Sequence, residues 1–273
     1  MHDSSKTILG EALLDRMECS GRCFEYHRAW PWLRKLGVIS GANAVQEYCQ
    51  RPAQAEFANA TSILIAGCAD EGLLESVVGA LGPRNREVAV TVTDLCQTPL
   101  NRCNSVANAH GWDITTVKSD LLALDLPGLF DLAVGHSILS FLAVDDRQAF
   151  FKNVAAQLKP GGMMYLFQAV RDGEDGSEVR FDAAEGQRFI DRALSAFRQS
   201  DVAMEEDTFA EMIEGFVATR RGVLVSDLNH VLHCATSSGF EPHRVQNYDD
   251  GAKSANIAAN RRTMVLHLRK CHV

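Results

Sequence analysis

The chain has 273 residues, of which 46% are hydrophobic and 23% are charged, proportions that exclude a collagen-like, disordered or disulfide-dense protein. A formal net charge of −8 without a basic patch predicts no nucleic-acid partner, and no run reaches the roughly 18 apolar residues of a membrane span. Eight cysteines in a chain without a recognisable export signal favour reduced thiols and a cytoplasmic protein.

The predicted elements fall into three zones. Residues 1–60 are expected to be helical and to form an N-terminal cap. From residue 61 to 170, short β-rich runs alternate with amphipathic segments, which is typical of a parallel sheet covered on both faces. The expected strands are 62–66, 87–93, 114–118, 129–135 and 163–168, and the expected helices between them are 71–81, 98–110 and 145–158.

Residues 171–223 interrupt this alternation. A polar loop precedes two predicted helices, 183–199 and 208–220, which we interpret as a helical insertion that forms a lid. The alternation resumes with a helix at 226–237 and strands at 241–247 and 262–270. Residues 61–170 and 224–273 are therefore predicted to form one α/β domain.

A tight turn follows the first strand. Gly67 permits the bend, and the small side chains of Cys68 and Ala69 let a ligand approach the backbone. Asp70 and Glu71 stand where a pyrophosphate-binding turn would offer bare amides, which argues against a nicotinamide dehydrogenase. Their charge favours a ligand with a cationic group, such as the ammonium and sulfonium of S-adenosylmethionine. The alternative is that these acids only complement the helix dipole.

Acidic residues also end the second and third strands. Asp94 lies about 20 residues after the glycine turn, where it can accept both hydroxyls of a ribose, although helix capping is the alternative. Asp120, followed by the apolar Leu121, suits an adenine amine and ring. The fourth strand then ends at Gly135 and His136.

These motifs together resemble the class I S-adenosylmethionine-dependent methyltransferases. The resemblance covers Ile63 to Phe167, and its motifs are the turn 67–72, Asp94, Ser119-Asp120, Phe130-Asp131-Leu132 and Leu158-Lys159-Pro160-Gly161-Gly162. It implies a doubly wound, Rossmann-like α/β fold with a seven-stranded, mostly parallel sheet whose last strand is antiparallel. It also implies S-adenosylmethionine as the cofactor.

The resemblance further implies a cofactor site. Its residues are Gly67, Cys68, Ala69, Asp70, Gly72, Asp94, Leu95, Asp120, Leu121, Gly135 and His136. In this assignment Asp94 holds the ribose, Leu95 packs on the adenine, and Gly135 and His136 face the methionine end. His136, which titrates near neutrality, is the candidate general base, and the alternative is a histidine bonded to the backbone.

Candidate substrate residues come from the cap and the insertion. They are Tyr26, His27, Trp30, Phe216 and Arg220. The alternative is that the aromatic residues only pin the cap to the core, and Arg34 is expected on a solvated face. No metal site is predicted, because Cys19 and Cys23 lack a second cysteine pair.

The predicted function is methyl transfer from S-adenosylmethionine to an oxygen or nitrogen of a small molecule, by in-line displacement. Ile65 stands where the family usually has an acid, and Ala69 replaces the usual second glycine. These departures leave open a protein that binds the cofactor for a cyclisation or elimination, or one that acts as a non-catalytic partner. The sequence leaves the oligomeric state open, with a homodimer as one option.

Overall fold

Seven β-strands form the central sheet, in the order β3-β2-β1-β4-β5-β9-β8. The computed structural model describes residues 18–19, 22–39, 43–50, 57, 59–248 and 262–272. The strands are β1 (Ser62–Ala66), β2 (Ala89–Asp94), β3 (Ile114–Lys118), β4 (Phe130–His136), β5 (Leu158–Val170), β8 (Phe240–Tyr248) and β9 (Arg262–Lys270). The pairs among β1 to β5 are parallel, and β9 runs antiparallel to both β5 and β8. The predicted doubly wound fold with an antiparallel last strand is confirmed.

The first strand shows why this sequence forms a sheet buried on both faces. Successive side chains of a strand point to opposite faces, and all of the positions from Ile63 to Ala66 are apolar and buried. Ile63 and Ile65 join the core cluster on one face, and Leu64 and Ala66 join the cluster on the other. An uninterrupted apolar run is therefore required here, as in other parallel sheets.

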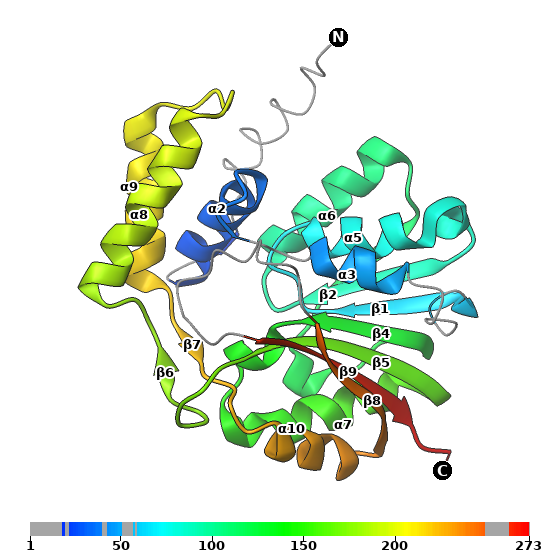
Figure 1. Cartoon of the computed structure of the whole chain (residues 1–273). Coiled ribbons are helices and arrows are strands. Elements are labelled where there is room, and N and C mark those ends of the chain that lie inside the picture. Colours follow the sequence, from blue (N-terminus) through cyan, green and yellow to red (C-terminus); the bar gives the residue numbers. More distant parts are fainter. Residues whose placement is uncertain are drawn as a thin grey trace.

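Helices cover both faces of the sheet (Figure 1). On one face lie α3 (Asn43–Cys49), α5 (Gly72–Leu81) and α6 (Gln97–His110), whose buried side chains share one core cluster with β1 and β2. On the other face lie α7 (Arg147–Gln157) and α10 (Leu228–Thr236).

A separate helical layer, called the cap below, lies at one end of the sheet (Figure 1). It consists of α2 (Arg22–Lys35), α8 (Ala183–Arg198) and α9 (Glu206–Thr219), which share a third apolar core. A two-stranded antiparallel ribbon of β6 (Glu178–Val179) and β7 (Gly222–Val223) connects α8 and α9 to the sheet. The sequence therefore brings α2 from the N-terminal zone and the two helices of the insertion into one layer.

Asp175 fastens the insertion to the sheet. Its carboxylate lies 2.6 Å from the guanidinium of the fully buried Arg147 and accepts the backbone N–H of Ser226 at 2.8 Å. Arg147 also donates to the carbonyl oxygen of Leu224. Both ends of the insertion are thereby bound to α7.

Two local predictions differ from the structure. The last parallel strand begins at Leu158 instead of residue 163, because the Gly-rich turn continues in extended conformation with a register shift against β4. The ribbon of β6 and β7 is absent from the predicted elements, since two-residue strands carry no periodic pattern. Residues 1–17 of the predicted N-terminal cap and 249–261 of the predicted α/β domain lie outside the described residues. No helix in the described part of the chain has the length and apolar character to span a membrane.

Candidate active site

The glycine turn lies at the carboxyl ends of the parallel strands, where ligands of open α/β sheets bind. The N–H of Gly67 donates to the carbonyl oxygen of Thr93 at 2.9 Å, which fixes the turn against the end of β2. Gly67 has a φ of +82°, and a Cβ built on it would lie 2.7 Å from Cδ1 of Ile138. The left-handed conformation therefore favours glycine at this position, and a Cβ would also require the end of the Ile138 side chain to move.

Asp94 joins the turns that follow β1 and β2. One carboxylate oxygen accepts the N–H of Cys68 at 2.9 Å, and the other accepts the N–H of Cys96 at 2.7 Å. Burial raises the pKa of Asp94, and these two hydrogen bonds oppose the rise. Each carboxylate oxygen has a second lone pair, so both can still accept a hydroxyl hydrogen.

Asp70 and Glu71 face arginines instead of an open site. Arg34, on α2, lies 2.6 Å from Asp70 and 2.7 Å from Glu71, and Arg102, on α6, lies 2.7 Å from Glu71. The expectation that these acids present uncompensated charge to a cationic ligand is therefore wrong, as is the solvated position expected for Arg34. Their contacts tie the cap helix α2 to the glycine turn.

Burial and charge act in opposite directions on this pair of acids. Burial raises the pKa of Asp70, and the neighbouring Glu71 adds to the rise. Burial also disfavours the charge of Glu71, but Arg102 and Arg34 outweigh it and hold its pKa below the usual value. Gly72 is part of the same contact, because its N–H donates to Asp70 and a Cβ on it would lie 2.7 Å from Nε of Arg34.

The residues predicted for the adenine pocket lie on two neighbouring turns. The side chain of Leu95 is 61% exposed, although it directly follows the buried end of β2. Asp120 accepts the N–H of Leu122 and thereby caps a short 3₁₀ turn over Leu121–Ala123. Leu121 is buried, and its Cδ1 lies 3.5 Å from the Cβ position of Gly67. The exposed leucine beside Asp94 provides an apolar surface for a ring.

Beyond β4 the backbone is strained. Ser137 has a φ of +55°, a left-handed conformation that non-glycine residues rarely adopt, and it follows directly after His136. Its N–H donates to the carbonyl oxygen of Phe167 at 2.7 Å, which holds the bend. Such strain is concentrated at functional sites. His136 itself is half-buried at the end of β4, and its role as a base stays a prediction.

Tyr26, Trp30 and Phe141 form an aromatic surface where the cap meets the sheet. The Tyr26 ring stacks on Trp30 at a centroid distance of 4.9 Å and contacts the ring of Phe141 edge to face at 5.6 Å. Burial raises the pKa of Tyr26, partly opposed by Arg220, and the charges of Asp70 and Asp94 add to the rise. Tyr26 therefore lies close to both Asp70 of the glycine turn and Asp94.

Two of the predicted substrate residues are engaged in the structure. Phe216 is 2% exposed and lies in the apolar core of the cap, stacked against Phe189. Nδ1 of the buried His27 lies 2.8 Å from the carbonyl oxygen of Ala69, and because a carbonyl only accepts, Nδ1 donates. Burial lowers the pKa of His27, which favours the neutral ring.

An arginine side chain, that of Arg220, lies over the aromatic surface. The guanidinium of Arg220 lies over the rings of Tyr26 and Phe141, 5.5 and 5.1 Å from their centroids, and donates to the carbonyl oxygen of Arg221. Burial lowers the pKa of Arg171, and the nearby positive charge of Arg220 lowers it further. Within the described ranges neither arginine forms a salt bridge with a carboxylate. The charge of Glu185 acts on Arg171 in the opposite direction, without a direct ion pair.

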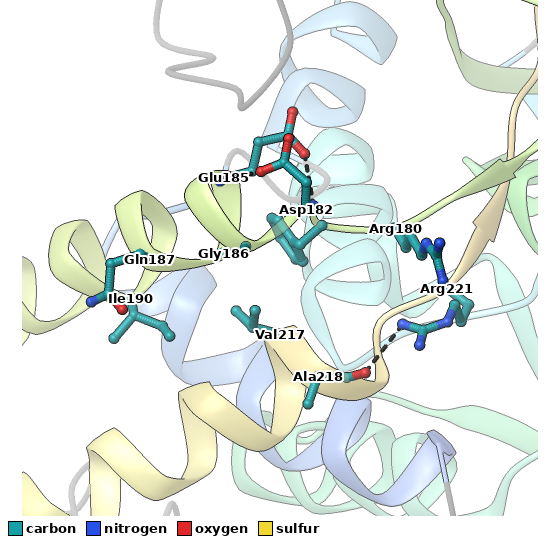
Figure 2. A pocket seen from close by; sticks show the side chains of 11 residues that line it. Arg180, Asp182, Glu185, Gly186, Gln187, Ile190, Val217, Ala218 and Arg221 are labelled. Atoms are coloured by element: carbon teal, nitrogen blue, oxygen red, sulfur yellow. Dashed lines mark hydrogen bonds between the residues drawn. The ribbon is translucent and has the colours of Figure 1, made fainter.

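A hollow of about 730 Å³ lies within the cap, between the start of α8 and the end of α9 (Figure 2). Gly186 and Ile190 line it from α8, Val217 lines it from α9, and Arg180 and Arg221 lie together at one end. It shares no residue with the carboxyl edge of the sheet, so it is separate from the site described above.

Sequence reasoning missed Arg34, Arg102, Cys96, Ser137 and Arg171. Each acts through a contact with a distant segment, as Arg34 does with Asp70. No local pattern marks such partners, since an arginine on an amphipathic helix looks the same whether its partner is water or a buried carboxylate.

Residues 63–162 match the family model described as a methyltransferase domain. This stretch contains the glycine turn, Asp94 and the end of β4. Over these residues, which make up just over a third of the chain, the sequence is therefore similar to methyltransferase domains. No curated protein matches the sequence.

Solved structures share the fold at low identity. The [4+2]-cyclase SpnF is 14% identical with a TM-score of 0.56, covering 85% of this chain and 82% of its own. The mitomycin 7-O-methyltransferase MmcR is 13% identical with a TM-score of 0.52, and the match covers 84% of this chain but 53% of that protein. An S-adenosylmethionine-dependent methyltransferase from Methanosarcina mazei is 16% identical with a TM-score of 0.51, covering 82% and 99%. At these low identities, the structural matches establish a shared fold and nothing more.

Proposed function

We propose that this chain transfers the methyl group of S-adenosylmethionine to an oxygen or nitrogen of a small molecule. The observation that carries the proposal is the position of Asp94. Its carboxylate binds the turns after β1 and β2 together at the carboxyl edge, next to the exposed Leu95 and close to Tyr26 of the cap. A carboxylate that can bind a ribose, an exposed apolar side chain that can contact an adenine ring and an aromatic side chain of the cap thus lie side by side.

The residues at this edge fit the cofactor. Asp94 would accept the ribose hydroxyls, Leu95 and Leu121 would contact the adenine, and the turn at Gly67 would allow close approach of the methionine portion. When bound, S-adenosylmethionine supplies an electrophilic methyl group on a sulfonium. Because Arg34 and Arg102 already compensate Asp70 and Glu71, we assign recognition of the cationic end to backbone carbonyls of the glycine turn.

The acceptor would lie against the cap. Tyr26 and Phe141 supply aromatic rings in contact with each other, and the guanidinium of Arg220 lies over both. A second arginine, Arg171, lies close to Arg220, and repulsion from the positive charge of Arg220 lowers the pKa of Arg171. Two neighbouring, partly buried cations favour a ligand with a carboxylate or phosphate group. MmcR, whose name gives a small-molecule substrate, has the same fold. We therefore propose a small aromatic or apolar acceptor with one anionic group.

Catalysis would consist chiefly of alignment. Holding the acceptor in line with the methyl group and sulfur contributes up to about 7–11 kcal/mol. His136, at the end of β4, is the residue we propose to remove the acceptor proton, which typically contributes about 100- to 10,000-fold in rate. A His136→Gln variant is expected to lose rate while it keeps its affinity for S-adenosylhomocysteine.

Calorimetry with S-adenosylhomocysteine tests the cofactor site. Asp94→Ala is expected to weaken binding at least about tenfold, because it removes hydrogen bonds to a charged acceptor. Asp201→Ala, at an exposed site of the insertion, is the matched control. Unfolding of both variants shows whether the α/β domain is intact. Equal affinity of the Asp94→Ala variant and the parent would contradict the proposed site.

Methyl-labelled cofactor tests the reaction. Incubation with a panel of aromatic carboxylates and their uncharged amides is expected to give labelled carboxylates, and Arg220→Met is expected to raise KM for them selectively. The second candidate function is a non-methylating reaction, which is favoured by the departures at Ile65 and Ala69 and compatible with the cyclase SpnF, which has this fold. Substrate consumed while the label stays on the cofactor would support that function and overturn methyl transfer.

A further inference from the structure

Three cysteines and a histidine converge at the junction between the cap and the sheet. Ligand atoms of Cys19, His27 and Cys96 all lie within 4.8 Å of one another. Cys23 lies on the same face of α2 as His27 and close to Cys96. All eight cysteines of the chain are free thiols in the structure. Four potential ligands of a soft metal are thus collected from two distant segments.

We propose that Cys19, Cys23, His27 and Cys96 form a tetrahedral metal site of the Cys₃His type, with Zn²⁺ as the expected ion. Thiolate and imidazole are the ligands that Zn²⁺ prefers, and four protein ligands are typical of a structural site. The sequence predicts no metal here because it offers Cys19 and Cys23 without a second pair. The fold supplies the missing ligands from His27 and from the turn after β2.

The local structure positions each ligand. Cys23 and His27 are four residues apart on α2, so they share one face of the helix, and Cys19 lies four residues before Cys23. Cys19 is docked against α6 by a hydrogen bond from its thiol to Oγ1 of Thr98 at 3.0 Å. The N–H of Cys96 is bound by Asp94 at 2.7 Å. These contacts hold the cluster together within the protein alone.

The surroundings of His27 suit a metal ligand. Its Nδ1–H donates to the carbonyl oxygen of Ala69, which leaves the lone pair of the neutral ring on Nε2. A metal-bound histidine usually has this kind of outer hydrogen bond to a carbonyl, which fixes the tautomer and the ring orientation. Bound Zn²⁺ would deprotonate the thiols.

The site would fasten α2 beside Asp94. Three ligands come from the segment that begins the cap, and the fourth lies two residues after the ribose acid. A metal ion here would therefore hold the cap helix against the cofactor-binding edge. This consequence rests on the proposed function, whereas metal binding itself does not.

Metal content of the full chain, purified without an affinity tag or chelator and under reducing conditions, tests the proposal. Elemental analysis is expected to give about one Zn²⁺ per chain after incubation with zinc. Co²⁺ is expected to give an intense tetrahedral absorption spectrum with thiolate charge-transfer bands. Cys96→Ser is expected to lose both signals, whereas Cys271→Ser, a thiol outside the cluster, is expected to keep them.

A second measurement keeps the proposal testable if the Cys96→Ser variant does not fold. A strong chelator added to the parent protein is expected to lower its Tm, and zinc is expected to restore it. The proposal is overturned if the zinc-incubated parent holds no metal, if cobalt shows no thiolate bands, or if Cys96→Ser binds as much metal as the parent. Mass spectrometry that finds a disulfide between Cys96 and Cys19 or Cys23, with no metal bound, would overturn it in favour of a redox pair. Because none of these readouts uses S-adenosylmethionine, they are independent of the proposed function.

Discussion

Arg34→Met is expected to weaken the attachment of the cap to the glycine turn more than any change at the surface. Arg34 contacts three carboxylates, at 2.6 Å on Asp70, 2.7 Å on Glu71 and 3.2 Å on Glu75. Methionine keeps much of the side-chain volume but removes the charge. Asp70, which is almost completely buried, then loses its counter-ion, whereas Glu71 keeps Arg102.

Breaking a buried ion pair on one side costs about 3–5 kcal/mol. Because Asp70 keeps the N–H of Gly72 and Glu71 keeps Arg102, we expect the lower end, about 3 kcal/mol, or roughly 6–12 °C in Tm. The loss depends on pH. Burial already raises the pKa of Asp70, and removal of Arg34 raises it further. A raised folded-state pKa disfavours the folded state as pH increases above the unfolded value near 4. The deficit is therefore expected to be smaller at about pH 5 than at about pH 8.

Urea unfolding of the parent and the variant at both pH values measures this effect. Arg198→Met is the matched control, since Arg198 forms an exposed pair with Glu206 on the surface of the cap. The control is expected to show no measurable change. A double variant with Asp70→Asn is expected to recover part of the stability, because it removes the stranded charge. A loss below about 1 kcal/mol, or an equal loss at both pH values, would refute the reasoning.

Four further outcomes are expected. Gly67→Ala should destabilise the fold by about 1 kcal/mol or more in urea unfolding, because φ is +82° and the end of the Ile138 side chain must move. Leu95→Ala should lower the affinity for S-adenosylhomocysteine roughly tenfold in calorimetry and leave Tm unchanged. Arg147→Met should cost about 3 kcal/mol, because it removes the counter-ion of the carboxylate that fastens the insertion, which keeps the N–H of Ser226. Burial opposes the charge of Asp131, but hydrogen bonds from Lys159 and Thr61 hold its pKa below the usual value. Its contribution is therefore present above about pH 4 and lost on acidification, and Asp131→Asn should flatten the stability profile in that range.

The fold could be predicted because its signals are local. The run Ser62–Ala66 is apolar at each position from 63 to 66, and a glycine turn follows it, so the buried strand and its end follow from adjacent residues. The order of the motifs then determined the topology through the family resemblance. Element ends were less certain, as at Leu158, where extended backbone continues through a glycine turn.

The site was only partly predictable, for a physical reason. The position of Asp94 could be predicted because this residue ends a strand. The charge balance at Asp70 could not, because it depends on Arg34, which lies on a separate helix. A sequence gives the formal charge of each residue, but the net charge at a site depends on which residues the fold brings into contact. The same limit applies to Cys96, whose partners come from the N-terminal segment.

The contacts of α2 also decide where the site can open. His27 bonds to the carbonyl of Ala69 and Arg34 to Asp70, so this helix is attached to the glycine turn at two points along its length. Its apolar side shares a core with α8 and α9, so these helices cannot separate from it without exposing that core. In contrast, Phe141 is 47% exposed, and its contacts with Tyr26 and Arg220 are confined to the edge of the cap. Because Phe141 is exposed whereas α2 is attached to the glycine turn and shares a core, the acceptor is expected to enter beside Phe141 while the glycine turn and α2 stay together.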